Sequence, residues 1–335
     1  MQRRLIYEFE TYAREPILRR MPDGSLICLF LTGGPREPHN ENVTMISRSF
    51  DDGETWTEPE VLFSHSHRGV WCSEVFAECD PPFIAVHTYN AESWYREIQT
   101  FISYSFDGGE RWQEPASFPC GLNGVSLRQG IVMSNGEWLF PVYWQETRGG
   151  FDWPEDILRT KPEFLCGVAI SSDEGMSFQR HGALRSGEGV ALWEPNCVEL
   201  EDGHIVMMMR AQTHLYVSES FDYGRSWSEP RKSVIPNSNT KITLLKVRGH
   251  IVLLNNPVAD ASWEGRTHLE IWISDDLMRS WKKKVPIMPP EEKWFYPHAF
   301  ADERQRMLYV ACENGKRHEL IKISFDELGI QPRVP

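Results

Sequence analysis

An octapeptide related to Ser-x-Asp-x-Gly-x-x-Trp recurs six times along the 335 residues of this chain. The copies begin at residues 49, 105, 171, 220, 274 and 324 and read SFDDGETW, SFDGGERW, SSDEGMSF, SFDYGRSW, SDDLMRSW and SFDELGIQ. All six keep Ser-x-Asp, and the aspartates follow one another at intervals of 56, 66, 49, 54 and 50 residues. The fifth copy has Met278 in place of glycine, and the sixth keeps little beyond Ser324 and Asp326. Self-similarity at such a period indicates one structural unit that is repeated within the fold.

The recurring residues suit a turn between two strands. An aspartate carboxylate accepts hydrogen bonds from amides just after it, glycine tolerates a positive φ, and tryptophan anchors the turn by burying apolar surface. The segments before the octapeptides, such as VTMISRS, LYVSES and HLEIWIS, read as β-strands. We therefore interpret each octapeptide as a turn that joins two antiparallel strands, with an aspartate that serves structure rather than catalysis.

A second set of turns lies upstream of the octapeptides. These tight-turn dipeptides between β-rich segments are Asp23-Gly24, Asn135-Gly136 and Asp202-Gly203. Each repeat then contains four strands in about 50 residues, which is the size of one blade of a β-propeller. The sequence predicts an all-β fold, a six-bladed β-propeller of four-stranded antiparallel blades, as a single domain over residues 1–335. The N-terminal segment 3–9 is available to complete the last blade and close the ring.

The net charge and the cysteine pattern of the chain argue against several classes of partner. A formal net charge of −13 argues against nucleic acid and gives no attraction to an anionic membrane. The N-terminal segment lacks a signal-peptide core, and no stretch approaches the roughly 18 apolar residues of a membrane span. The seven cysteines are scattered and form no CxxC pair, so we expect no disulfides, no zinc site and no cofactor, in a reduced cytoplasmic protein. His65 and His67 form an HxH pair that we assign to a surface loop rather than to a metal site.

The alternation of antiparallel strands places several polar residues on one face of the predicted propeller. The start of the first strand, the end of the second and the start of the third strand of each blade lie on the face opposite the aspartate turns. Residues at such positions are Arg14, Glu194, Arg210, Arg266 and Tyr296, and the loop of blade one adds Arg36, Glu37, His39 and Glu41. Clustered guanidinium groups repel one another unless an anion joins them, so three arginines on one face predict a bound carboxylate, sulfate or phosphate.

Six Asp-boxes of this form resemble those of the sialidase superfamily, the six-bladed propellers with BNR repeats, over essentially the whole chain. REPIL is similar to the sialidase Arg-Ile-Pro segment, which implies that Arg14 is the first of three carboxylate-binding arginines. WEPNCVELEDGHIVMMMR resembles the stretch from the catalytic glutamate to the second arginine, matching Glu194 and Arg210. NNPVADASWEGRTHLEIWIS resembles the segment of the third arginine, Arg266, and FYPHAF the segment of the nucleophilic tyrosine, Tyr296. The boxes specify the fold strongly and the function weakly, because proteins that are not enzymes carry them too.

Two features depart from the sialidase pattern. Sialidases carry an aspartate as general acid/base in the top loop of blade one, whereas this loop, GGPREPHNENVTMISRS, contains none. Glu41, His39 or Glu37 could supply the proton instead. In addition, Glu15 replaces the apolar residue in the middle of the Arg-Ile-Pro segment.

Three functions follow as hypotheses, each with an acidic carbohydrate or glycoconjugate as partner. The first is an exo-acting glycosidase that removes a terminal carboxylate-bearing sugar, with Tyr296 activated by Glu194 and with Glu41 or His39 as proton donor. The second is a lyase for uronate glycans, in which His298, His39 or Tyr296 abstracts the C5 proton. The third is a glycan-binding propeller without turnover, in which exposed tryptophans such as Trp71, Trp94 and Trp144 stack on sugar rings.

Overall fold

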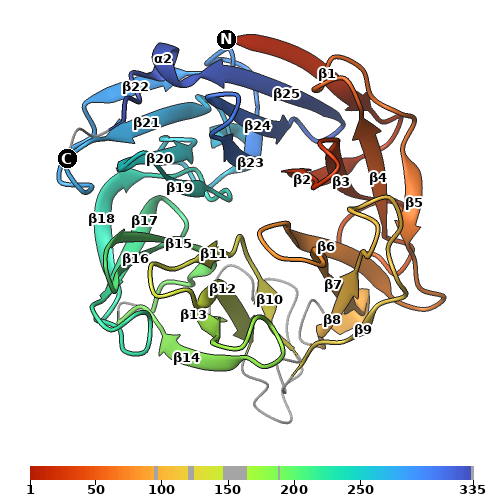
Figure 1. Ribbon diagram of the computed structural model, residues 1–335, viewed down its shortest axis with the longest axis horizontal. Coiled ribbons are helices and arrows are strands. Elements are labelled where there is room, and N and C mark those ends of the chain that lie inside the picture. The colour runs from red at the N-terminus through yellow and green to blue at the C-terminus, as the bar shows by residue number, and fades with distance from the viewer. Residues whose placement is uncertain (94–96, 120–123, 146–163, 188, 333–335) are drawn as a thin grey trace.

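The fold is an all-β propeller whose six sheets stand in a ring around a central axis (Figure 1). The structure is a computed structural model, and it describes residues 1–335 except 94–96, 120–123, 146–163, 188 and 333–335. Each blade is an antiparallel sheet, and in blades one to five the strand that comes first in the chain lies nearest the axis. The predicted fold class and the four-stranded blade are therefore confirmed.

Within each blade the strands follow one another from the axis outward. Blade one comprises β2 (Ala13–Arg20), β3 (Leu26–Thr32), β4 (Val43–Ser49) and β5 (Glu60–Phe63), and blade two β6 (Gly69–Phe76), β7 (Phe83–Tyr89), β8 (Gln99–Tyr104) and β9 (Ala116–Ser117). In blade three, β10 (Ser126–Leu127) and β11 (Ile131–Val132) both pair with β12 (Trp138–Gln145), followed by β13 (Phe164–Ser171) and β14 (Gln179–Leu184). Blade four comprises β15 (Trp193–Glu201), β16 (His204–Arg210), β17 (His214–Ser220) and β18 (Arg231–Pro236). Blade five comprises β19 (Thr243–Val247), β20 (His250–Asn255), β21 (Glu270–Ser274) and β22 (Lys283–Pro286).

The last blade joins the two ends of the chain. It contains β23 (Phe295–Asp302), β24 (Met307–Glu313) and β25 (Arg317–Ser324), and its outermost strand is β1 (Gln2–Glu8). β1 pairs antiparallel with β25, with Gln2 opposite Lys322 and Glu8 opposite Arg317. Figure 1 shows β1 lying along the outer rim of this blade beside β25. Closure of the ring by the N-terminal strand is therefore confirmed.

The box of blade four shows how the octapeptide closes a turn. The Ser220 hydroxyl donates to Asp222 at 2.7 Å and accepts from the amide of Gly224 at 2.9 Å. The second Asp222 oxygen accepts from the hydroxyl of Ser226, so the carboxylate is engaged within its own turn. Gly224 has a φ of 83°, and a Cβ there would lie 2.8 Å from a methyl carbon of Leu139 in blade three. Glycine is thus required both by the backbone conformation and by the close approach of the neighbouring blade.

The aromatic residue that ends each box lies in the seam between two blades. Apolar clusters fill the seams, and each contains buried residues from two neighbouring blades. The box residues that pack against these clusters or belong to them are Trp56, Trp112, Phe178, Trp227 and Trp281. The octapeptide therefore fixes the turn within one blade and also anchors that blade to the one before it.

The sixth octapeptide differs from this pattern. After β25 it forms a short helix, α2 (Phe325–Leu328), whose first turn is capped by a capping box between Ser324 and Glu327. The prediction that every octapeptide joins two antiparallel strands is therefore wrong for this copy, because the partner strand of β25 comes from the N-terminus. Phe325 and Leu328 are buried in the seam between blades five and six, where they take the place of the missing tryptophan.

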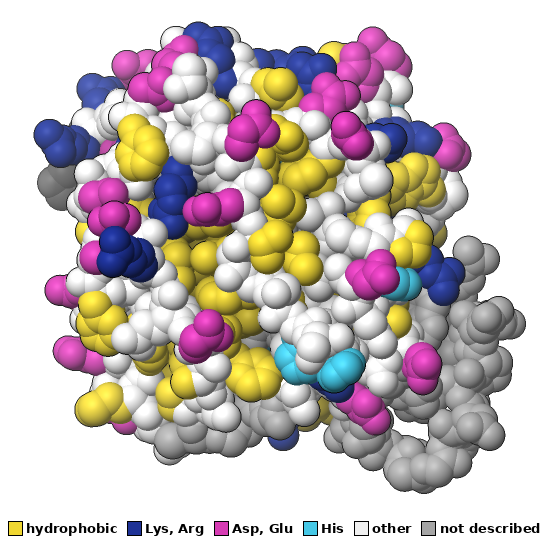
Figure 2. All heavy atoms as spheres, turned by 90° about the vertical axis from the view of Figure 1, so that its right-hand side faces the viewer, with side chains coloured by type: hydrophobic (Ala, Val, Ile, Leu, Met, Phe, Trp, Pro, Cys, Tyr) yellow, Lys and Arg dark blue, Asp and Glu magenta, His cyan; other side chains and the backbone are white. Residues whose placement is uncertain are grey.

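The outer surface carries both signs of charge. Figure 2 shows the face over blades one and two, where acidic and basic side chains alternate with hydrophobic ones among the described residues. His65 and His67 are exposed, with their ring centres 6.5 Å apart. Within the described residues, no helix has both the length and the apolar character needed to cross a membrane.

A serine-to-alanine change in one box tests the turn. Ser220 is 2% exposed, and Ser220→Ala leaves the buried amide of Gly224 without its acceptor. We expect a loss of about 1–3 kcal/mol in the free energy of unfolding, measured by urea denaturation. Ser117→Ala, at an exposed position of β9, serves as the control and should leave stability almost unchanged. Equal stability of the two variants would contradict this role of the box serine.

Candidate active site

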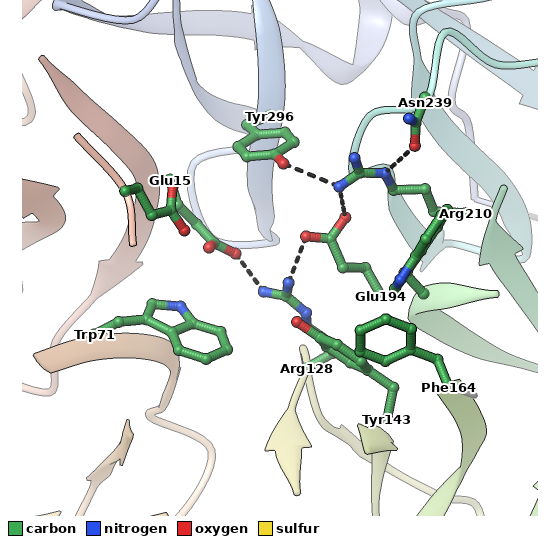
Figure 3. Close-up of a pocket in the computed structure, with 11 residues that line it drawn as sticks. Glu15, Trp71, Arg128, Tyr143, Phe164, Glu194, Arg210, Asn239 and Tyr296 are labelled. Carbon is green, nitrogen blue, oxygen red and sulfur yellow. Dashed lines mark hydrogen bonds and ion pairs between the residues drawn. The ribbon is translucent and has the colours of Figure 1, made fainter. Parts of the chain in front are cut away.

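A cavity of about 320 Å³ lies at the hub of the ring. All six blades contribute to its lining, through Glu15, Glu37, Trp71, Arg128, Tyr143, Phe164, Trp193, Glu194, Arg210, Asn239 and Tyr296. Figure 3 shows the labelled side chains converging from the surrounding strands. The hub is therefore the place where residues far apart in the sequence meet.

Three of the lining residues share one backbone device. Glu15, Glu194 and Tyr296 have φ values of 51°, 41° and 52°, and each precedes a proline near the start of the innermost strand of its blade. The register of the strand pairing shifts at each of these positions. Such bulges re-aim side chains at the rims of sheets and beside active sites. In this protein they turn a glutamate, a second glutamate and a tyrosine toward the same cavity (Figure 3).

Glu194 is held by two arginines. One carboxylate oxygen accepts from Arg210 Nη1 at 2.6 Å and the other from Arg128 Nη2 at 2.7 Å. Burial would raise the pKa of Glu194, but the positive charges of Arg210 and Arg128 outweigh it and hold this pKa at about 2. Glu194 is therefore an ionised carboxylate at neutral pH.

Tyr296 lies among cations. Its hydroxyl accepts a hydrogen bond from Arg210 Nη1 at 2.9 Å, from the same nitrogen that contacts Glu194. The guanidinium carbons of Arg14 and Arg266 lie 5.1 and 5.3 Å from the centre of its ring, and Lys241 Nζ lies 5.7 Å from it. At these distances the three cations make cation–π contacts with the ring.

Arg14 and Arg266 lie side by side beneath an aromatic cover. Both guanidinium carbons approach the Trp263 ring, at 5.1 and 4.9 Å from its centre. Arg14 has a carboxylate partner, Glu313, at 3.0 Å, whereas Arg266 donates only to the backbone oxygen of Asn239, at 2.9 Å. Within the described chain, Nε and Nη1 of Arg266 are buried without a hydrogen-bond partner, although the residue is only 9% exposed. Such a group lacks an acceptor that an anion would supply.

The predicted residues of the blade-one loop do not all reach the cavity. Glu37 lines it, whereas Arg36 is exposed. The Glu41 side chain is 74% exposed and lies 3.8 Å from Nδ1 of His39, and neither residue belongs to the lining. Of the three loop residues considered as proton donors, the structure therefore places Glu37 at the cavity.

His298 is buried and does not belong to the lining of the cavity. Its Nδ1 accepts from the backbone amide of Leu18 at 3.2 Å, and the buried side chain of Arg19 lies beside the ring. Burial, together with the charge of Arg19, lowers the pKa of His298 far below its usual range. The expectation that His298 belongs to the pocket is therefore not met by its position, and the imidazole is neutral.

The tryptophans considered as sugar platforms are not exposed. Trp71 is 3% exposed and contributes to the cavity, and Trp144 is 7% exposed with Arg180 over its ring. Trp94 lies outside the described residues. Exposed stacking by Trp71 and Trp144 is thus contradicted by their burial.

Four polar residues of the hub escaped the sequence-based prediction: Glu15 as a pocket residue, Arg128, Asn239 and Lys241. Arg128 follows β10, and Asn239 and Lys241 come just before β19, so all lie beside the innermost strand of a blade. The sequence signal was available, since the same topological rule that selected Arg14 and Tyr296 applies to blades three and five. Among the residues that the structure describes, no cluster of His, Cys, Asp and Glu could hold a metal ion.

Solved structures share this architecture. A Hadza microbial sialidase, Hz136, matches with a TM-score of 0.74 and 17% identity over 94% of this chain and 66% of its own. The NanB sialidase from Streptococcus pneumoniae matches with a TM-score of 0.71 and 14% identity, over 97% of this chain and 71% of its own. A protein of unknown function from Dyadobacter fermentans DSM 18053 matches with a TM-score of 0.70 and 16% identity, over 96% of this chain and 97% of its own. This chain thus spans about two thirds of the length of the two sialidases, and identities this low show a common fold.

The family is established by a different comparison. No curated protein matches the sequence. The model of the BNR repeat-like domain, however, matches residues 24–309, which is most of the chain. The match covers more than half of the chain, and the chain therefore belongs to the BNR repeat-like family.

Proposed function

We propose that this protein is an exo-acting glycoside hydrolase that removes a terminal carboxylate-bearing sugar, sialic acid or a chemically related acid. The observation that carries the proposal is the convergence of Arg14, Arg210 and Arg266 on Tyr296 at the hub cavity. Sialidases among the structural neighbours support the same reaction class.

The substrate carboxylate would bind between the arginines. Arg266 has two buried nitrogens without a partner, and a carboxylate offers acceptors to such a planar fork. Burial lowers the pKa of Arg266, and the neighbouring charges of Arg210 and Arg14 lower it further. An anion at this position would relieve the repulsion between the arginines, and this relief would contribute to the binding energy.

Tyr296 would act as the nucleophile. Its oxygen would attack the anomeric carbon, and Glu194 is ionised and close enough to share Arg210 Nη1 with the hydroxyl. Glu194 would accept the phenolic proton. A tyrosine also avoids setting a carboxylate nucleophile against an acidic sugar, which is the reason that sialidases depart from the two-carboxylate rule of glycosidases.

Glu37 would protonate the leaving oxygen. It comes from the loop in which a sialidase carries its acid, and it is the acidic residue of that loop that lines the cavity. The first step would then transfer the sugar to Tyr296 and the proton of Glu37 to the leaving alcohol. In the second step, Glu37 would take a proton from water as that water attacks the anomeric carbon, the bond from this carbon to the Tyr296 oxygen would break, and Glu194 would return the proton to Tyr296.

Binding of an acidic monosaccharide tests the arginine cluster. We expect N-acetylneuraminate to raise the melting temperature, and its uncharged relative N-acetylmannosamine to have no effect. Arg266→Met should weaken binding about tenfold or more, since a charged hydrogen-bond donor is lost. Arg36→Met, which alters an exposed arginine of the same face, should bind as the wild type does. Equal stabilisation by the neutral sugar would contradict a carboxylate site.

Replacement of Tyr296 by Phe tests the nucleophile. We expect Tyr296→Phe to reduce turnover of an aryl sialoside by several orders of magnitude, because the attacking oxygen is removed. Tyr223→Phe, in the box of blade four, is the matched control and should retain activity. Undiminished turnover in Tyr296→Phe would exclude the mechanism. A product that absorbs near the ultraviolet edge through a new C=C bond would instead indicate the lyase reaction.

Two substrates with different leaving groups test the proton donor. Glu37→Gln should lower kcat/KM by roughly 10²–10⁴-fold for a sialyllactose-type substrate, whose alcohol leaves only when protonated. The loss should be much smaller for a nitrophenyl glycoside, whose leaving group needs no proton. Glu41→Gln should stay near the wild type with both, since its side chain is exposed to solvent. A large loss in Glu41→Gln with Glu37→Gln unaffected would transfer the role to Glu41.

A further inference from the structure

Arg128 joins two carboxylates that come from different blades. Its Nη1 donates to Glu15 Oε1 of blade one, and its Nη2 donates to Glu194 Oε1 of blade four at 2.7 Å. Arg128 itself follows β10 in blade three and is buried. Figure 3 shows the guanidinium lying between the two carboxylates, and Arg128 belongs to the lining of the cavity.

Aromatic rings flank the guanidinium, and a backbone hydrogen bond holds the residue that carries it. It lies over the rings of Trp71 and Tyr143, at 5.7 and 5.4 Å from their centres, and the Arg128 amide donates to the carbonyl of Pro141 at 2.8 Å. Arginine suits this position because its planar fork offers separate N–H groups to two acceptors while it stacks on aromatic faces. A lysine would provide the charge without the fork.

Glu15 supplies the counter-charge. Its Oε1 accepts from Arg128 and lies 3.5 Å from Nζ of Lys241, which is also buried. Without Glu15, Arg128 and Lys241 would be two neighbouring buried cations with Glu194 as their shared anion. The glutamate that replaces an apolar residue of the Arg-Ile-Pro segment therefore has a physical reason: it compensates an arginine that also serves Glu194.

We propose that Arg128 is a positioning residue, which with Glu15 as its counter-ion orients and ionises Glu194 as the base for Tyr296. Arg128 occupies one oxygen of Glu194, so that the other oxygen faces Arg210 and, through the shared Nη1, the hydroxyl of Tyr296. This inference rests on the proposed function, because it assigns Glu194 the task of accepting the phenolic proton.

The charges around Glu194 determine whether each substitution raises or lowers the pKa of Glu194. The titratable and charged groups near it are Glu15, Arg128, Tyr143, Cys166, Arg210, Lys241 and Tyr296. Removal of the Arg128 charge takes away a cation that stabilises the carboxylate, so the pKa of Glu194 rises. Removal of the Glu15 charge leaves Glu194 as the one carboxylate that Arg128 contacts, and this change by itself lowers the pKa of Glu194. If Lys241, whose pKa burial already lowers, then loses its proton, the two changes offset each other. The pKa of Glu194 therefore stays at or below its wild-type value in Glu15→Gln.

The experiment compares Arg128→Gln, Arg128→Lys and Glu15→Gln with the wild type by two readouts. The first is the pH dependence of kcat/KM on an aryl sialoside. The second is the titration of the Glu194 side-chain carbon by NMR on protein labelled with carbon-13 glutamate, with Glu194→Gln to identify the signal. We expect Arg128→Gln to shift the acidic limb of the kcat/KM profile to higher pH, and to raise the pKa of Glu194, by about one unit or more. Arg128→Lys should lie between Arg128→Gln and the wild type, and Glu15→Gln should show no rise in either quantity.

Each outcome bears on the inference. An unchanged Glu194 titration in Arg128→Gln would overturn it, as would a rise in Glu15→Gln equal to that in Arg128→Gln, since a merely structural role would affect both variants alike. Because Arg128→Lys and Glu15→Gln are close in size to the wild-type residues, they keep the test valid if Arg128→Gln does not fold. Absence of turnover in the wild type would reject the proposed function, whereas the NMR titration would still decide whether Arg128 sets the ionisation of Glu194.

Discussion

The packing of each blade against the one before it is the interaction on which the rest of the structure depends. Apolar clusters fill the seams around the ring, and an aromatic residue of the box or, in the last blade, Phe325 of α2 packs into each. Repetition of one seam geometry brings the innermost strands into contact with one another around the axis. Arg14 and Tyr296 become neighbours through this repetition, although 282 residues, by subtraction, separate them in the sequence.

Inside this apolar frame, the hub holds many charged side chains that are buried or largely buried. Buried ions are tolerated where they are paired, and nearly every cation of the described hub has a carboxylate partner. The pairs are Arg14 with Glu313, Arg19 with Glu74, Arg128 with Glu15 and Glu194, and Arg210 with Glu194. Arg266 departs from this rule among the described residues, since its hydrogen bond goes to the backbone oxygen of Asn239 and two of its nitrogens are buried without an acceptor. The charge of Glu194 is thus compensated by two arginines, whereas Arg266 still has donors without an acceptor. An anion would bind at Arg266.

The sequence predicts the propeller fold better than it predicts the contacts between the side chains at the hub. Periodic boxes and tight turns are local signals, so the fold class, the blade count and the closing strand followed from them, and topology placed Glu194, Arg210 and Tyr296 at one end of the axis. The sixth box does not join two strands, because the strand that pairs with β25 comes from the N-terminal segment, as predicted, and the residues after β25 form α2 instead. The topological rule could have placed Arg128 at the hub, but its bridge between Glu15 and Glu194 joins three blades, and residue spacing does not reveal such a contact.

The strained positions of Glu15, Glu194 and Tyr296 explain why each is followed by proline. A positive φ in such residues costs about 1–3 kcal/mol and persists only where the surrounding packing enforces it. The register shift at each site would also leave one amide of the strand without a ladder partner, in a region where water cannot replace it. Proline has no amide hydrogen, so this donor is absent from the start. The X-Pro pair therefore lets a side chain leave the alternation of the strand and face the cavity without an unsatisfied backbone group behind it.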